Sequence, residues 1–155
     1  MTLIEKLVAA PVGSALAEAL LSRADILNLS EASHDAVIIP QSPGGLRHGL
    51  RAALAARMAR QYELPNLAEH YEALMRQNCE DEEPDDGVTQ GRTNAIVAHA
   101  DLLTLRPRDA TRTDIETLKA AGLTEPDIVR LAELSAFVSY QARVIKGLQA
   151  LKATQ

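Results

Sequence analysis

Residues 125–152 of this 155-residue chain read EPDIVRLAELSAFVSYQARVIKGLQALK. Apolar side chains recur through the segment at helical spacing, at Ile128, Leu131, Leu134, Phe137, Val138, Ala142, Val144, Ile145, Leu148 and Leu151. They cover far more than one stripe of the helix surface. A helix that is apolar over most of its circumference is either central in its fold or packed against another subunit. The segment therefore predicts a long helix, from Glu125 to about Lys152, in one of these two positions.

Signals for helix ends continue toward the N-terminus. Residues 124–127 (Thr-Glu-Pro-Asp) favour a helix start, because proline suits the first helical position and early acids suit the helix dipole. Residues 113–116 (Thr-Asp-Ile-Glu) form a capping-box pattern, and Gly122 is suited to ending that helix in the left-handed conformation. We expect three further helices over residues 46–62, 66–77 and 93–105, with Pro65 in the first turn of the second and Pro107 after the third.

The first 45 residues carry weaker signals. We expect one helix over residues 2–10, stopped by Pro11, and a second from Ser14 to about Asn28. Ser30 is a suitable N-cap for a third segment that ends in Val-Ile-Ile at residues 37–39. That β-branched triplet is compatible with a strand, but no partner strand is visible elsewhere. The sequence therefore predicts an all-α bundle of about seven helices, with a turn-rich joint over residues 40–45.

Composition fits one ordinary globular domain over residues 1–155. Hydrophobic residues make up 46%, charged residues 24% and aromatic residues only 3%, which favours helices rich in Ala and Leu. The net charge of −5 comes from residues 80–86, whose six acids leave the rest of the chain at +1 (−5 plus 6). No basic stripe with interleaved aromatics is present, which argues against nucleic acid as a partner. The uncharged stretch 7–17 is too short to span a membrane, and the segment before it lacks the positive start of a signal peptide, so we expect a cytoplasmic location.

Cys79 is the only cysteine, so disulfides and Cys-x-x-Cys chemistry within one chain are excluded. The acids that follow it disfavour a thiolate and argue against a nucleophilic role. We interpret residues 80–91 as a solvated acidic loop, because they contain Pro84 and Gly87 and show no apolar periodicity. Their spacing does not match a calcium-binding loop.

Three motifs follow one another in the C-terminal half. Residues 99–107 read HADLLTLRP, residues 118–124 read LKAAGLT and residues 140–148 read YQARVIKGL. In this order and at this spacing they resemble the Phe-Ala-Asp-x-Leu-Thr-x-x-Pro, Leu-x-x-Ala-Gly-Leu-Ser/Thr and Tyr-x-x-Arg-Val-x-x-Gly-Leu motifs of the alkylhydroperoxidase D (AhpD) and carboxymuconolactone decarboxylase family. The resemblance covers roughly residues 46–151 and leaves residues 1–45 as an N-terminal helical extension. It implies an AhpD-like bundle and a homo-oligomer formed through the C-terminal helix.

The family's reaction centre is a Glu followed by a Cys-x-x-Cys pair and a His, in which the cysteines carry out thiol–disulfide chemistry while the acid and the imidazole relay protons. In this chain the resemblance places the two cysteine positions on Leu64 and Leu67, the His position on Tyr71, and the Glu position near Ala52. His70 lies one place before the family's His position. Leucine cannot replace a sulfur nucleophile, so the resemblance predicts a scaffold that lacks thiol peroxidase activity of its own.

A titratable cluster remains at the same place. Glu63, Glu69, His70 and Tyr71 are the candidate catalytic residues, and Glu72 lies beside them, where it can form an i,i+4 pair with Arg76. They are compatible with general acid–base chemistry, as in the decarboxylase branch of the family, or with an ordinary half-exposed helix face. Arg57 shares a helical face with apolar residues and is a candidate to hold a substrate carboxylate if it turns inward, or it extends to solvent along its stem. No metal-ligand spacing is found, and no cofactor is implied.

Two functions of different classes follow. The first is a structural or binding subunit, as a homo-oligomer or paired with a related subunit that keeps the cysteines. The second is a cofactor-independent enzyme that uses His70 or Tyr71 with a nearby Glu on a small organic acid. A redox sensor based on Cys79 alone is a weaker third hypothesis, because of its acidic surroundings.

Overall fold

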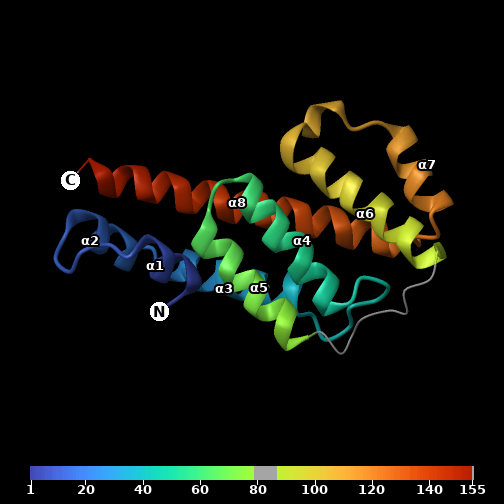
Figure 1. Cartoon of the computed structure of the whole chain (residues 1–155). Helices are drawn as coiled ribbons and strands as arrows, with labels where there is room; N and C mark the ends of the chain where they lie inside the picture. The colour runs from blue at the N-terminus through green and yellow to red at the C-terminus, as the bar shows by residue number, and fades with distance from the viewer. Residues whose placement is uncertain (79–86, 155) are drawn as a thin grey trace.

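The computed structural model describes residues 1–78 and 87–154, and every regular element in these ranges is helical (Figure 1). Eight α-helices and one short 3₁₀ helix are present there, so the predicted all-α class is confirmed. Cys79 and residues 80–86 of the expected acidic loop lie outside the described residues. Residues 87–91, expected in the same loop, instead begin the helix Gly87–Leu105, which therefore starts earlier than predicted. The elements are α1 Leu3–Val8, α2 Ala15–Leu21, α3 Ala24–Ile38, α4 His48–Gln61, α5 Pro65–Gln77, α6 Gly87–Leu105, η2 Pro107–Asp109, α7 Arg112–Ala120 and α8 Glu125–Ala153.

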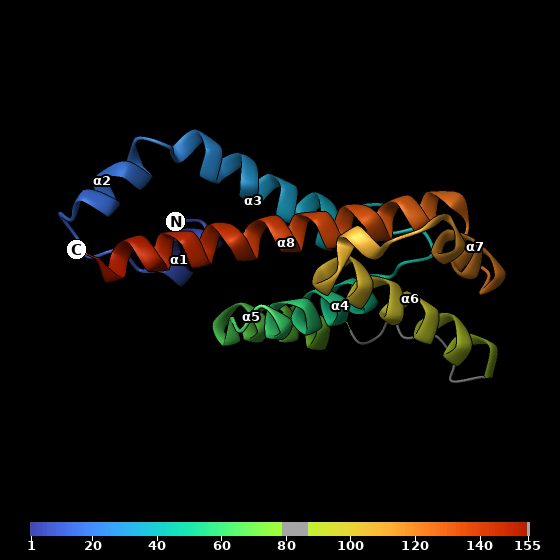
Figure 2. The same ribbon diagram turned by 90° about the horizontal axis from the view of Figure 1, so that it is seen from above.

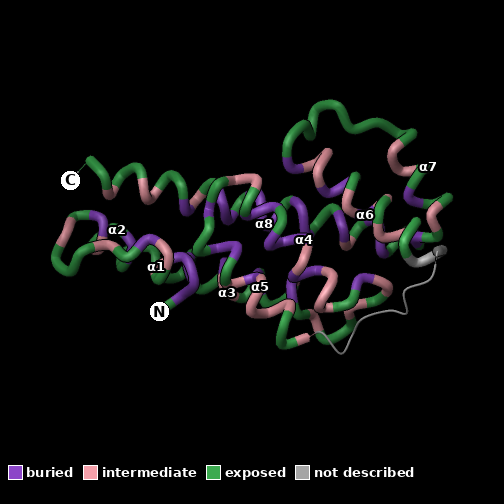
Figure 3. The backbone as a smooth tube through the Cα atoms, in the orientation of Figure 1, coloured by how far each residue is buried: buried purple, intermediate pink, exposed green. Residues whose placement is uncertain are grey.

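Helix α8 is central, as one of the two readings of its sequence predicted. It contacts α1, α2, α3, α4, α6 and α7. Figure 2 shows α8 running between α3 on one side and α4 with α5 on the other. Leu131, Leu134 and Val138 of α8 are fully buried. The last two turns of α8 are mostly exposed (Figure 3), so the helix is covered along its middle and not along its whole length.

The ends of the C-terminal helices follow the expected capping chemistry with one correction. Thr124 is the N-cap of α8, where its hydroxyl accepts a hydrogen bond from the Asp127 amide, and Gly122 has a φ of 87°. The capping box of α7 is Thr111 with Asp114, not Thr113 with Glu116. The Asp114 carboxylate accepts from the Thr111 amide at 2.7 Å, which starts the helix two residues earlier than predicted.

The N-terminal segment differs more from the prediction. The expected helix from Ser14 to Asn28 is two helices, because α2 ends at Leu21 and α3 begins at Ala24. Ser30 is not an N-cap. It lies inside α3 on a buried face shared with Leu27, His34 and Ile38, and its hydroxyl forms a 2.7 Å hydrogen bond with the Tyr140 hydroxyl. This face repeats at helical spacing, so α3 runs through to Ile38 and the possible strand over residues 37–39 is not formed.

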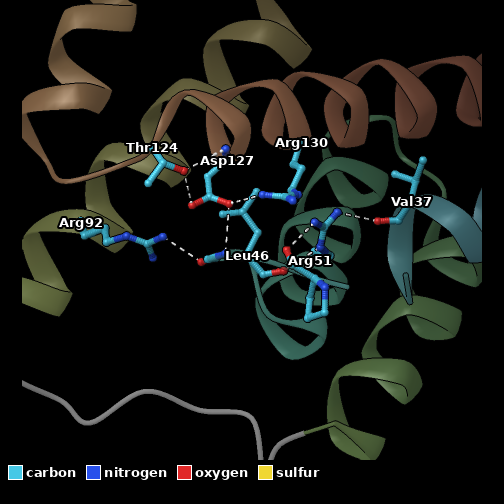
Figure 4. Close-up of polar contacts among 9 residues, drawn as sticks. Val37, Leu46, Arg51, Arg92, Thr124, Asp127 and Arg130 are labelled. Carbon is cyan, nitrogen blue, oxygen red and sulfur yellow. Dashed lines mark hydrogen bonds and ion pairs between the residues drawn. The ribbon is translucent and has the colours of Figure 1, made fainter. Parts of the chain in front are cut away.

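The joint between α3 and α4 is held by a buried arginine (Figure 4). Arg51 is only 2% exposed and donates three hydrogen bonds to the carbonyls of Leu46, Val37 and Pro43, at 2.6, 2.8 and 2.9 Å. Burial lowers the pKa of its guanidinium. A buried cation is costly unless its donors are used, and here every guanidinium nitrogen has a carbonyl partner. Arg51 therefore fixes the joint to the start of α4.

Asp127 ties the same joint to α8. Its carboxylate accepts from the Gly45 amide at 3.0 Å and from Arg130 Nη1 at 2.8 Å. Burial acts to raise its pKa, but the hydrogen bonds from Thr124, Gly45 and Arg130 outweigh burial, so the pKa is lowered. A Cβ at position 45 would come within 2.5 Å of Asp127 Oδ2, which explains the glycine there. Among the described residues, no helix is both long enough and apolar enough to cross a membrane.

Candidate functional site

The two leucines that the resemblance places at the family's cysteine positions lie at the start of α5. Leu64 is its N-cap and Leu67 is in its first turn, and they are 5% and 1% exposed. Both side chains line a cavity of about 160 Å³ between α1, α5 and α8. Leu7 and Ile145 complete its apolar wall. The lining also includes Glu63, Pro65, Asn66 and Gln149.

This cavity contains no nucleophile. Its one ionisable lining residue is Glu63, whose side chain is 87% exposed and whose carboxylate forms a 3.4 Å ion pair with Lys146. Glu63 has a φ of 56°, because it is the left-handed residue that ends α4. The cavity is therefore mostly apolar with a few polar lining residues, and none of its lining residues carries a redox-active group.

His70 lies one turn beyond Leu67 and meets a second histidine from the N-terminal segment. Its Nε2 is 3.0 Å from Nε2 of His34, and Nδ1 of His34 is 2.9 Å from Oδ1 of Asp35. His34 is 5% exposed, whereas the Asp35 side chain is 63% exposed. Burial, then His34 and Lys6, lowers the pKa of His70 to about 4, against the opposing charge of Glu31. At neutral pH His70 is therefore a neutral imidazole.

Tyr71 is fully buried beside this pair. Its ring stacks on His34 with a centroid distance of 5.8 Å, and its hydroxyl donates to Gln141 Oε1 at 2.5 Å. Burial raises the pKa of Tyr71 well above its ordinary value, although the hydrogen bond to Gln141 acts in the opposite direction. The phenol is therefore held in its neutral form and its polar atom is already engaged.

The other candidates lie apart from His70. Glu69 is exposed. Glu72 pairs with Arg60 of α4, not with Arg76 of its own helix. Arg57 faces α6, where its Nε and Nη2 both bind the Asp101 carboxylate at 2.7 Å, and its side chain is 48% exposed. This hydrogen bonding lowers the pKa of Asp101. Arg57 is thus among neither the cavity-lining residues nor the partners of His70.

Sequence reasoning did not pair His34, Asp35 and Gln141 with the site. His34 falls on the buried face of α3 by its spacing from Leu27 and Ser30, so periodicity alone could have placed it inward. Its partner could not be found that way, because His34 and His70 are 36 residues apart and meet only in the tertiary structure. Among the described residues, no three His, Cys, Asp or Glu side chains converge as a metal site would require.

Comparison with known proteins identifies the fold alone. No family model matches the chain, and no curated protein matches it. A solved structure is similar, that of an uncharacterized peroxidase-related protein from Silicibacter sp. TM1040. The two chains share 18% sequence identity and superpose with a TM-score of 0.57, over 80% of this chain and 68% of the other. The helical arrangement is therefore shared with a peroxidase-related protein.

Proposed function

We propose that this chain is a diverged AhpD-like protein that has lost thiol peroxidase activity and acts as a structural or binding subunit. One observation carries the proposal: the side chains of Leu64 and Leu67 fill the place at the start of α5 where the resemblance puts the reactive sulfurs. Both leucines are buried and both line the cavity. Peroxide reduction by the family's mechanism needs a thiolate there, and no lining residue provides one.

A thiol-dependent peroxidase assay tests this proposal. We expect no rate above background with cumene hydroperoxide and a dithiol reductant, for the natural protein and for Cys79→Ser alike. A robust rate that survives Cys79→Ser would overturn the proposal. The double variant Leu64→Cys/Leu67→Cys should gain peroxide-driven disulfide formation, whereas the matched Leu64→Ser/Leu67→Ser variant should not.

The outward faces of α8 and α3 support the oligomeric part of the proposal. Val129 and Tyr140 of α8 are 57% and 41% exposed, and Ile26 and Leu29 of the neighbouring α3 are 50% and 67% exposed. Exposed apolar side chains on two adjacent helices are compatible with an interaction surface. We expect a homo-oligomer through this side of α8. Light scattering should show that Leu29→Glu/Val129→Glu dissociates it, whereas Leu105→Glu, at an exposed leucine of α6, should leave it intact.

A subunit that keeps the cysteine pair is the alternative occupant of that surface. In that case the isolated natural chain and its Leu29→Glu/Val129→Glu variant would both be monomeric. A monomeric natural protein in light scattering contradicts the homo-oligomer.

The His34–His70 pair favours a second candidate function, a cofactor-independent acid–base enzyme acting on a small organic acid. A neutral imidazole held by a second imidazole and a carboxylate resembles the way proteins orient general bases. A screen of small lactone and 2-oxo acids for isomerisation or decarboxylation tests it, with His70→Gln as the inactive control. Turnover that is equal in the natural protein and in His70→Gln would remove this candidate.

A further inference from the structure

With an ionised Asp35 and two neutral imidazoles, the side chains of Asp35, His34 and His70 allow only one arrangement of protons. An ionised carboxylate can only accept, so Nδ1 of His34 carries the hydrogen that bonds Asp35 Oδ1 at 2.9 Å. A neutral His34 then has its lone pair on Nε2. Because that atom faces His70 Nε2 at 3.0 Å, His70 must donate through Nε2, which leaves its lone pair on Nδ1.

The Nδ1 atom of His70 is the open end of this chain of hydrogen bonds. It has no partner among the described residues. It is also absent from the buried polar atoms that lack one, which are Gln61 Oε1 and His99 Nδ1 in the described part of the chain. His70 is half-buried as a residue, so this nitrogen reaches the surface. A ligand can therefore meet the lone pair without displacing a protein group.

The charges around His70 come from α1, α3 and α5. Glu31 of α3 accepts from the Leu3 amide at 2.9 Å and so holds α1 in place. Lys6 of α1 is exposed, forms no hydrogen bond or ion pair within the described residues, and lies close enough for its charge to help lower the pKa of His70. Tyr71 adds no charge, because its phenol is neutral. Glu69, next to His70 on α5, is also exposed and without a hydrogen bond or ion pair in the described part of the chain, so the charges near His70 are of both signs.

We propose that Asp35, His34 and His70 form a proton relay whose acid–base atom is His70 Nδ1. His34 and Asp35 are positioning residues, since they act through His70. The proposal rests on the second candidate function and names its base and its relay. A divalent metal is the less favoured occupant, because two imidazoles without a third convergent ligand make a poor metal site.

The step conserves atoms and electrons without any co-reactant. His70 Nδ1 takes a proton from a carbon next to the substrate's carbonyl, and the electron pair of that C–H bond stays on the substrate as an enolate. The new positive charge on His70 strengthens its Nε2–H hydrogen bond to His34 and is balanced through Asp35. The same proton then returns to the substrate at the same or another carbon, which regenerates the neutral imidazole.

Nitrogen-detected NMR of the histidine rings in the full chain tests the relay. At neutral pH we expect His70 as the Nε2–H tautomer and His34 as the Nδ1–H tautomer. Asp35→Asn should lower the pKa of His70 by about half a unit or more, because it removes the negative charge that stabilises the imidazolium. Asp25→Asn, at another exposed acid of α3, should not change it. An Nδ1–H tautomer of His70, or the same pKa in Asp35→Asn as in the natural protein, overturns the relay.

The histidine tautomers and the change in the pKa of His70 are both measured without turnover. A failed activity screen therefore removes the second candidate function, while the tautomers still decide the relay.

Discussion

Acidification should destabilise this protein through His70. The unfolded imidazole has a pKa near 6.5, whereas the folded one has a pKa of about 4. At a pH between these two pKa values, His70 is protonated in the unfolded chain and neutral in the folded chain. The stability that is fully present above pH 6.5 is therefore lost progressively as the pH falls toward 4.

The size of the loss follows from the same pKa values. A fall in the pKa of His70 from 6.5 to about 4 corresponds, for a fully buried group, to a loss of about 3.4 kcal/mol in the free energy of unfolding. The His70 residue is only half-buried, so solvent screening reduces the expected effect to about 2 kcal/mol. In a chain of this size, that is a large share of the free energy of unfolding.

Urea unfolding at a series of pH values measures this effect. His70→Gln is the informative variant, because its amide can still donate to His34 but cannot titrate. We expect the free energy of unfolding to fall less in His70→Gln than in the natural protein between neutral pH and pH 4, by about 2 kcal/mol. Glu69→Gln, on the exposed side of the same turn, is the control and should follow the natural protein. A difference between His70→Gln and the natural protein that stays constant with pH would refute the reasoning.

Three further substitutions probe features outside the relay. Glu63→Gly should raise the free energy of unfolding in urea by about 0.5–1 kcal/mol, because glycine adopts the φ of 56° without strain; a loss of stability would show that the Lys146 pair outweighs that strain. Arg51→Met should cost about 3 kcal/mol, since it leaves three carbonyls of the joint without their donor, whereas Arg143→Met on the exposed side of α8 should cost less than about 0.5 kcal/mol; equal effects would contradict the assigned role of Arg51. His99→Phe should stabilise the protein by about 1 kcal/mol, because Nδ1 of His99 is buried without a partner; a destabilised variant would mean that the added ring volume is not accommodated.

The parts of the fold that depend on local chemistry could be predicted from sequence. Thr124 and Gly122 act as end signals through their own backbone and side-chain atoms, so their roles follow from a few neighbouring residues. The same locality explains the errors. Thr111 and Thr113 each precede an acid three residues later, and only the preceding η2 turn, which ends at Asp109, decides which of them starts α7.

The candidate site could be predicted only on its α5 side. Leu64, Leu67 and His70 stand close together in sequence, so their neighbourhood in space was expected. The buried arginine, in contrast, is Arg51, and the one considered for burial, Arg57, stays at the surface with Asp101. Both lie on α4 among apolar residues, and the difference is made by carbonyls of the joint and by α6, which periodicity does not locate.

The N-cap and first two turns of α5 carry both the positions considered for thiol chemistry, Leu64 and Leu67, and the residue considered for proton transfer, His70. On the proposed function, Leu64 and Leu67 stand where the resemblance puts the reactive thiols, and neither side chain offers a lone pair to oxidise. His70, one turn later, keeps the capacity to move a proton, and that capacity is oriented by His34 and Asp35 of α3. The positions proposed to have lost thiol chemistry thus lie in residues 46–151, which carry the resemblance, whereas His34 and Asp35 come from residues 1–45, which do not. If the site is active, substitutions at His34 should therefore alter its proton chemistry as strongly as substitutions at His70, although only His70 lies near a position of the family's reaction centre.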